Sequence, residues 1–335
     1  MLKNLDKIIN NKFNHFSRNI TVISRSNCIT DLYEKPIKLN SLNNSIGINL
    51  RNSKKIIPEV KVENIILDFS GTCVDAFTLA PASAFIDVFK KYKIDICIEN
   101  AVKKPMGLYK YDHIKYILNM NDVKNQWYRE YNRDIKEYDI NNIYNDFIKL
   151  QVEILPKYCI PLPKVVETMN FLRNTGIKFG GCSGFNREMI DKILDNTKDK
   201  GLYFDSTFLA DDIKDKNKHY LGGRPYPYMI YENLFNLDNK NIASVIKVDD
   251  SIIGIEEGNN AGCWTVGICN YSNYINVNTL EEYNKMSDSE KFEKKEYSKN
   301  KFKNESNADY IIGEFDELIA VVDDINKRLK NGEKL

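Results

Sequence analysis

Short apolar segments alternate with helical patterns along most of this chain, and that alternation constrains the fold more than any other feature. Each apolar segment has the length of a buried strand, and in the stretches between them apolar residues recur every three or four positions. Alternation of this kind is typical of a parallel, doubly wound sheet. The expected strands are residues 62–69, 177–180, 204–209, 244–248 and 265–268, and the expected helices are residues 164–174, 187–198, 226–235 and 252–260.

A long, aromatic-rich helical stretch interrupts the alternation after the first expected strand. It runs from residue 82 to about residue 155, which is too long for a simple crossover connection. We therefore predict an α/β fold, a Rossmann-like doubly wound parallel sheet with an inserted α-helical cap. The predicted parts are an N-terminal extension (1–58), a core (59–77 and 161–335) and the cap (78–160).

Composition excludes several classes of protein. The formal net charge is +1, so no strong overall field attracts nucleic acid, and we expect no nucleic-acid partner. No apolar run reaches the roughly 18–20 residues that span a bilayer, so we expect no membrane partner either. The seven cysteines are scattered and odd in number, which indicates reduced thiols and a cytoplasmic protein. They are Cys28, Cys73, Cys97, Cys159, Cys182, Cys263 and Cys269.

The extension differs from the rest of the chain because it is rich in Asn and in basic residues and poor in acidic ones. Such a composition is typical of an organelle transit peptide, but also of a disordered segment. We slightly favour disorder, and the alternative is an organelle-targeted form directed by this extension.

Polar side chains follow the expected strands at the points where the strands end. In an open α/β sheet, the carboxyl ends of the strands form the edge at which ligands bind. Two separated acidic clusters, a hydroxyl and a guanidinium at that edge suit magnesium-assisted phosphoryl transfer. A lone Asp-x-x-Gly-Thr is more often a helix cap, but four such features in order are a stronger signal. The residues are Asp68, Ser70, Ser183, Arg224, Asp249 and Asp250.

The order of these motifs resembles that of the haloacid dehalogenase-like hydrolases. The expected cap adds the segment KPMGLYKYDHI at residues 104–114, which is very similar to the cap signature of the phosphonatase family, whose members cleave a carbon–phosphorus bond. Further similar segments are LAP at 79–81, GRPYP at 223–227, IKV at 246–248 and EGNNAGCWTVG at 257–267. The resemblance covers about residues 60–325, and it implies a homodimer packed partly through the cap.

The resemblance implies a role for each site residue in the hydrolysis of a small-molecule phosphonate or phosphate substrate. It implies that the amine of Lys110 forms a Schiff base with the aldehyde of phosphonoacetaldehyde, because a carbanion cannot leave unaided. It implies Asp68 as the nucleophile and His113 as a proton shuttle. Mg²⁺ would be bound by Asp68, Asp249, Asp250 and Ser70, through its carbonyl. The remaining substrate contacts would come from Met106, Ser183, Gly184, Arg187 and Arg224.

The chain departs from the family pattern at several positions. Ser70 stands where the phosphonatase pattern has Ala and where most phosphatases of the superfamily have Asp. The fourth motif normally reads Gly-Asp followed four residues later by a second Asp, whereas this chain has Asp249, Asp250 and then Gly254. Asp249 could replace the missing carboxylate.

Two alternatives to a phosphonatase therefore stay open. One is a magnesium-dependent phosphatase of a small phosphorylated metabolite, although Ser70 leaves no carboxylic acid to protonate an ester oxygen. The other is a non-catalytic member of the family that binds a phosphorylated metabolite. Without the resemblance, Lys110 would be read as a solvated surface charge and His113 as an ordinary histidine.

Overall fold

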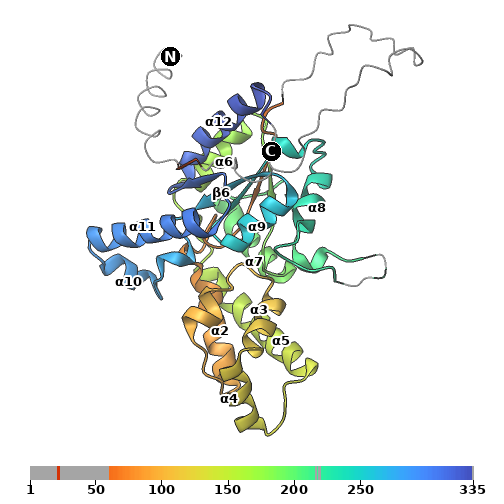
Figure 1. The fold of residues 1–335 in the computed structure, drawn as a ribbon, viewed down its shortest axis with the longest axis vertical. Coiled ribbons are helices and arrows are strands. Elements are labelled where there is room, and N and C mark those ends of the chain that lie inside the picture. The colour runs from red at the N-terminus through yellow and green to blue at the C-terminus, as the bar shows by residue number, and fades with distance from the viewer. Residues whose placement is uncertain (1–20, 23–59, 216, 218–219, 334–335) are drawn as a thin grey trace, which may run out of the picture.

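The computed structural model describes residues 21–22, 60–215, 217 and 220–333. A sheet crosses the centre of the molecule in the order β1-β7-β6-β5-β2-β3-β4 (Figure 1). All neighbouring strands are parallel except β1, which pairs antiparallel with β7. The predicted doubly wound parallel sheet is thus confirmed. The strands are β1 (Thr21–Val22), β2 (Asn64–Leu67), β3 (Lys178–Gly181), β4 (Ser206–Thr207), β5 (Val245–Asp249), β6 (Trp264–Ile268) and β7 (Tyr310–Ile312).

Two strands of the sheet were not among the expected ones. Strand β7 has only three residues, too short a run for a pattern to stand out. Strand β1 belongs to the extension, and its two residues pair with β7 at the edge of the sheet. The rest of the extension lies outside the described residues, and so do both hypotheses about it.

Helices cover both faces of the sheet because successive strand residues point to opposite sides. In β2, Ile65 and Leu67 pack in the cluster that contains α6 and α12, whereas Ile66 packs on the other face against α8. The helices of the core are α6 (Val165–Arg173), α7 (Arg187–Thr197), α8 (Tyr228–Asn236), α9 (Ile252–Ala261), α10 (Leu280–Lys285), α11 (Asp288–Glu305) and α12 (Leu318–Lys330).

The helices from α2 to α5, which lie between β2 and α6 in the chain, form a separate group below the sheet in Figure 1. It contains α2 (Leu79–Lys91), a π-helix (Ile98–Lys103), α3 (Lys110–Leu118), α4 (Asn121–Tyr131) and α5 (Glu137–Ile154). Helices α2 and α3 both pack on α5, and the rings of Phe85 and Phe147 lie 4.4 Å apart between them. This group is the helical insertion that the sequence predicts, and we call it the cap.

The connections place one edge of the sheet against the cap. Strand β2 ends at Leu67 and β5 ends at Asp249, so Asp68 and Asp250 both follow directly at the carboxyl edge. Among the described residues, none of the helices combines the length and the apolar character that a membrane crossing requires.

Candidate active site

A small cavity lies where the cap meets the carboxyl edge of the sheet. Its lining combines core residues from four separate segments with cap residues, and it includes most of the residues that the sequence singles out. The lining residues are Asp68, Ser70, Thr78, Met106, Gly107, Lys110, Ser183, Gly184, Phe185, Arg224, Asp250 and Ser251.

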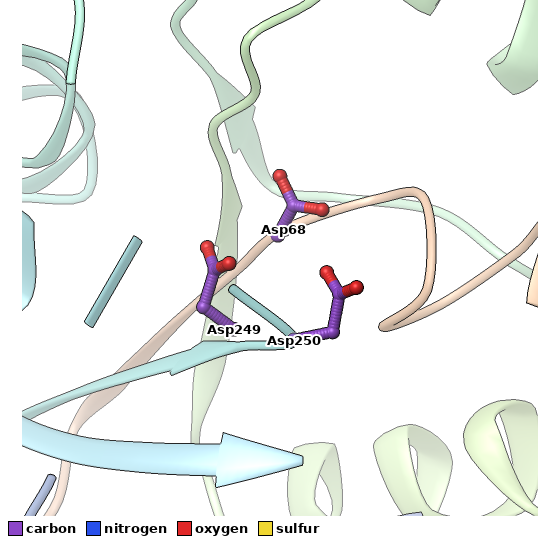
Figure 2. Close-up of side chains that lie close together, drawn as sticks. All are labelled: Asp68, Asp249 and Asp250. Atoms are coloured by element: carbon purple, nitrogen blue, oxygen red, sulfur yellow. The ribbon is translucent and has the colours of Figure 1, made fainter. Parts of the chain in front are cut away.

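Three carboxyl groups meet on the sheet side of this cavity. Oxygens of Asp68, Asp249 and Asp250 lie within 4.8 Å of one another, and all three residues are buried (Figure 2). Burial raises the pKa of Asp68 to about 6, although Arg224 beside it opposes the shift. Burial, together with the neighbouring Asp68 and Asp249, raises the pKa of Asp250 well above its usual value.

The surroundings of Asp250 suit a divalent cation. Its oxygens accept hydrogen bonds from the hydroxyls of Thr72 and Thr78, at 3.4 and 3.3 Å. Among the described residues, no Lys or Arg forms an ion pair with Asp250. Its partners there are neutral hydroxyls, and these do not neutralise the negative charge of a carboxylate. A buried carboxylate beside two others is costly unless a cation accompanies it. Carboxylate oxygens are the ligands that Mg²⁺ prefers, and the donor set therefore fits that ion.

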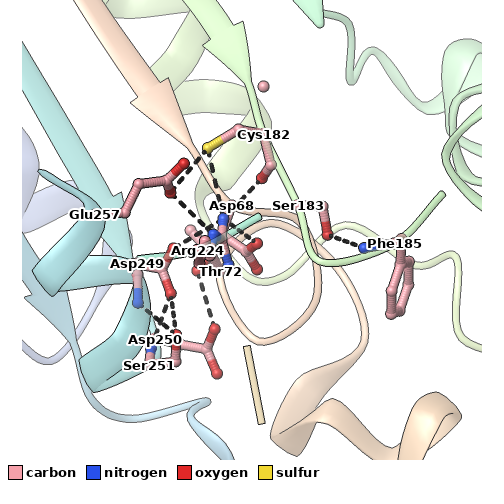
Figure 3. A network of polar contacts seen from close by, with 12 residues as sticks. Asp68, Thr72, Cys182, Ser183, Phe185, Arg224, Asp249, Asp250, Ser251 and Glu257 are labelled. Atoms are coloured by element: carbon pink, nitrogen blue, oxygen red, sulfur yellow. Dashed lines mark hydrogen bonds and ion pairs between the residues drawn. The ribbon is translucent and has the colours of Figure 1, made fainter. Parts of the chain in front are cut away.

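Arg224 links the nucleophile candidate to the rest of the core. Its Nη2 lies 2.9 Å from Oδ1 of Asp68 and 3.2 Å from Oδ2 of Asp249, and its Nε lies 2.9 Å from Oε2 of Glu257 (Figure 3). The Arg224 side chain is 1% exposed, so these pairs are shielded from water and salt. The guanidinium is thus fixed beside Asp68 at the cavity wall.

Lys247 and Glu257 belong to the same network, although neither was among the predicted site residues. Lys247 is completely buried in β5, with Nζ 2.8 Å from Oδ2 of Asp249 and 3.1 Å from Sγ of Cys182. The sequence contains a signal for such a contact, because a lysine inside a short apolar strand requires a buried acidic partner. Burial alone would raise the pKa of Asp249, but Arg224 and Lys247 together lower it below its usual value.

Replacing Arg224 with Met is expected to lower the free energy of unfolding by about 3–5 kcal/mol, because it leaves buried carboxylates without their partner. Chemical denaturation monitored by circular dichroism measures the change. Arg129→Met is the control, since Arg129 lies exposed on α4 and its replacement should stay within about 0.5 kcal/mol. Equal effects for the two variants would contradict a structural role for the network.

Lys110 brings an amine from the cap into the cavity. It is the first residue of α3 and only 2% exposed, and its Nζ lies 3.4 Å from the carbonyl oxygen of Leu108 and 3.9 Å from Sδ of Met106. The ring of Phe185 lies 5.2 Å from the same Nζ. Burial lowers the pKa of Lys110 to about 8, against the opposing pull of Asp68. Near pH 7 roughly a tenth of this amine is therefore neutral, far more than for a lysine of ordinary pKa.

A direct backbone contact fixes Lys110 against the core. The amide of Lys110 donates a hydrogen bond of 3.0 Å to the carbonyl oxygen of Gly184. A β-carbon on Gly184 would overlap the carbonyl groups of Gly107 and Leu108. Glycine at position 184 therefore permits the close approach of cap and core that places the amine in the cavity.

The two serines of the site are held in different ways. The hydroxyl of Ser70 donates a hydrogen bond of 2.9 Å to Oδ2 of Asp75, which also accepts from the backbone amides at the start of α2. Asp75 was not among the predicted site residues, and it joins the nucleophile loop to the first helix of the cap. The hydroxyl of Ser183 accepts a hydrogen bond of 3.2 Å from the amide of Phe185 and lines the cavity.

His113 lies one helical turn after Lys110 but is not among the residues that line the cavity. It is completely buried, its Nε2 lies 2.8 Å from the carbonyl oxygen of Ala101, and its ring lies 4.1 Å from that of Phe85. Burial, and then the charge of Lys110, lowers its pKa well below 6.5. The imidazole is therefore neutral, with Nδ1 free of hydrogen-bond partners among the described residues.

Arg187, expected to bind substrate, is placed outside the cavity lining. Its guanidinium donates to the hydroxyl and carbonyl of Thr207 at 3.0 and 3.1 Å and pairs with Asp212. These contacts tie the start of α7 to β4. The structure thus does not bring Arg187 together with the other predicted site residues.

Comparisons with known proteins agree with this architecture. The family of haloacid dehalogenase-like hydrolases matches residues 65–268. The phosphonoacetaldehyde hydrolase of Vibrio parahaemolyticus is 36% identical over 274 residues, which are 82% of this chain and 98% of the relative. That of Bacillus cereus is 35% identical over 269 residues, 80% of this chain and 98% of the relative.

A solved structure leads to the same family. The phosphonoacetaldehyde hydrolase-like protein of Oleispira antarctica is 32% identical, with a TM-score of 0.76 over 83% of this chain and 97% of that protein. The match therefore includes the cap as well as the sheet. The chain belongs to the haloacid dehalogenase-like hydrolases and, among them, to the phosphonoacetaldehyde hydrolase family.

Proposed function

We propose that this protein hydrolyses phosphonoacetaldehyde to acetaldehyde and phosphate. The observation that carries the proposal is the buried amine of Lys110, whose pKa is lowered to about 8, in one cavity with Asp68 and Asp250. A nucleophilic amine and a nucleophilic carboxylate are the two groups that cleavage of a carbon–phosphorus bond beside an aldehyde needs. The names of the relatives support the same reaction.

The reaction begins at Lys110. Its neutral amine attacks the aldehyde carbon, and loss of water forms an imine. A carboxylate oxygen of Asp68 then attacks phosphorus, and the electrons of the carbon–phosphorus bond move into the protonated imine to give an enamine. Protonation of the enamine carbon and hydrolysis release acetaldehyde and restore Lys110. Water finally cleaves the acyl phosphate on Asp68 and releases phosphate.

The other residues orient the phosphonate group. Arg224 lines the cavity beside Asp68, and Ser183 and Gly184 line it from the end of β3. Mg²⁺, held by Asp68, Asp250 and the carbonyl of Ser70, would neutralise negative charge on the phosphonate. Asp249 is already paired with Lys247 and Arg224, so we assign it to Arg224 and not to the ion.

His113 is proposed as the base that takes a proton from Lys110 during imine formation. His113 is neutral, and the positive charge of Lys110 helps to lower its pKa. The two groups therefore interact electrostatically. The burial of His113 limits this role to proton exchange with the amine, since its ring does not line the cavity.

The contacts of Ser70 favour the phosphonatase over a phosphatase. Its hydroxyl donates to Asp75, and no carboxylic acid occupies position 70 to protonate a departing ester oxygen. An enamine needs no such acid in order to leave, because the protonated imine on Lys110 accepts the electrons of the carbon–phosphorus bond.

The cytoplasmic location stays a prediction, and so does the homodimer that the family resemblance implies. Light scattering after size-exclusion chromatography measures the oligomeric state.

The direct test supplies phosphonoacetaldehyde with Mg²⁺ and measures acetaldehyde with a coupled dehydrogenase and phosphate by colorimetry. We expect the two products in equal amounts, and loss of both when a chelator removes Mg²⁺. p-Nitrophenyl phosphate serves as the ester control and should be hydrolysed poorly. Rapid ester hydrolysis without acetaldehyde from the phosphonate would establish the phosphatase instead.

The rate of imine formation is expected to rise with pH up to the pKa of Lys110, about 8, and then to level off. Below that pKa the neutral amine increases roughly tenfold per pH unit, because the protonated form cannot attack. Borohydride trapping with acetaldehyde measures this rate, since acetaldehyde has no ionisable phosphonate to confuse the profile. A rate that keeps rising to pH 10 would show a lysine of ordinary pKa.

A further inference from the structure

The cap and the core make a further contact beside the cavity, through Tyr220 of the core. Tyr220 lies between β4 and α8, and it begins a short loop that ends at Arg224 and that we call the arginine loop (220–224). Its hydroxyl donates a hydrogen bond of 3.1 Å to Oδ2 of Asp112 in α3, and its ring lies 5.2 Å from that of Tyr109. Tyr109 and Asp112 stand on either side of Lys110 in the chain, so Tyr220 contacts the cap at the segment that carries the amine.

The cap side of this contact is itself held in place. The hydroxyl oxygens of Tyr109 and of Tyr144 in α5 lie 2.9 Å apart, and the ring of Tyr111 packs edge-on against that of Tyr144 at 5.3 Å. Partial burial, and then the charge of Asp112, raises the pKa of Tyr220, so its hydroxyl stays protonated and donates to the carboxylate. Tyr220 therefore binds a surface that α3 and α5 fix together.

The core side of the contact leads directly to Arg224. The arginine loop continues through two glycines to Arg224, whose Nη2 lies 2.9 Å from Oδ1 of Asp68. A β-carbon on Gly223 would lie 2.9 Å from Cβ of Tyr109 and 3.0 Å from the hydroxyl oxygen of Tyr220. Glycine at position 223 therefore lets the loop lie directly against the cap, immediately before the residue that contacts the nucleophile candidate.

We propose that Tyr220 is a positioning residue that ties the arginine loop to the cap and so sets the place of Arg224 relative to Lys110. Lys110 acts on the aldehyde and Arg224 orients the phosphonate beside Asp68, so one substrate needs both groups in register. A misplacement of about 1 Å lowers a rate by as much as roughly 100-fold. Tyr220 is not among the residues that line the cavity, so it acts through Arg224 and not on the substrate. The kinetic consequence rests on the proposed function, whereas the contact of Tyr220 with Asp112 does not.

A double-mutant cycle in thermal stability tests the contact without substrate. Tyr220→Phe removes the hydroxyl but keeps the ring, and Asp112→Ala removes the acceptor. Tyr220 is 38% exposed, so water competes for this hydrogen bond and the effect is modest. We expect Tyr220→Phe to lower the melting temperature by about 2 °C in the wild type and to have no effect in the Asp112→Ala background. Tyr297→Phe, at an exposed position of α11, is the control and should change nothing.

Kinetics distinguish positioning from a merely structural role. Tyr220→Ala removes the ring as well as the hydroxyl, and we expect it to lower kcat for phosphonoacetaldehyde roughly 10–100-fold, with a smaller loss in Tyr220→Phe. Imine formation with acetaldehyde needs Lys110 but not Arg224, because acetaldehyde has no phosphonate. Borohydride trapping with acetaldehyde should therefore proceed at nearly the wild-type rate in both variants. Tyr297→Ala is the control and should retain wild-type rates in both assays.

Three results would overturn the positioning role of Tyr220. They are an equal loss of melting temperature from Tyr220→Phe with and without Asp112, an unchanged kcat in Tyr220→Ala, and an equal loss of trapping and of cleavage in that variant. A wild type that does not cleave phosphonoacetaldehyde would instead overturn the proposed function, and the stability cycle would still decide whether Tyr220 and Asp112 tie the loop to the cap.

Discussion

Lys110→Arg is expected to lower the rate of acetaldehyde formation from phosphonoacetaldehyde by about 10⁴-fold or more, as removal of the nucleophile does in other covalent catalysts. The guanidinium stays protonated at every accessible pH and cannot form an imine. The positive charge beside Asp68 and Asp250 is retained, so an effect on charge alone would be small. Acetaldehyde release and borohydride trapping, followed by mass spectrometry of the peptide that carries residue 110, measure the result.

The matched control for this variant is Lys115→Arg, which makes the same change at an exposed position of α3. It should retain wild-type activity and leave the trapped peptide unchanged. The melting temperature of Lys110→Arg must stay near that of the wild type for the loss to be chemical. Activity retained in a folded Lys110→Arg protein would exclude the Schiff base.

Asp68→Asn is expected to lower the rate of phosphate release by about 10⁴-fold or more, while Lys110 still forms its imine. An amide oxygen is too weak a nucleophile to attack phosphorus, and the substitution also removes one charge from the carboxylate cluster. Lys110 forms its imine before Asp68 acts, so borohydride should still trap phosphonoacetaldehyde on Lys110. Phosphate assay and mass spectrometry of the same sample report the two steps separately.

The control for Asp68→Asn is Asp87→Asn, at an exposed position of α2, which should leave both steps intact. The variants at positions 68 and 110 thus form a pair, in which one loses phosphorus chemistry alone and the other loses both steps. Loss of trapping in a folded Asp68→Asn protein would mean that Asp68 is needed for imine formation and would contradict the proposed order.

Much of the fold could be predicted because its determinants are local. The apolar runs that became β2, β3, β5 and β6 are recognisable within a few residues, and the helices between them show the spacing of one buried face. The sequence predicts a strand over 204–209, of which only two residues pair as β4, and it does not predict β7. Whether such short segments form strands depends on the partner edge that the rest of the fold provides.

The candidate site, like the fold, could be predicted in part from local sequence and depends in part on the tertiary structure. The sequence placed Asp68 and Asp250 at strand ends and Arg224 in a loop between two strands, and the family resemblance added Lys110. Neither the sequence nor the resemblance predicted a role for Lys247 or Glu257, which form an ion pair. The resemblance implied substrate contact from Arg187, whose guanidinium in the structure joins α7 to β4. The residue type indicates the chemistry of each side chain. The partner of that side chain often lies far away in the sequence, so the contact cannot be predicted from a local pattern.

The sequence by itself determined the parallel α/β architecture, the helical insertion and the types of group available for catalysis. These follow from periodicity and from the direction in which parallel strands end, both properties of short segments. The tertiary structure alone decided that Gly184 lets the cap touch the core and that Gly254 leaves room for Asp249. It also decided that burial lowers the pKa of Lys110. Close approach and desolvation arise only when distant segments pack together, so no local pattern could reveal them.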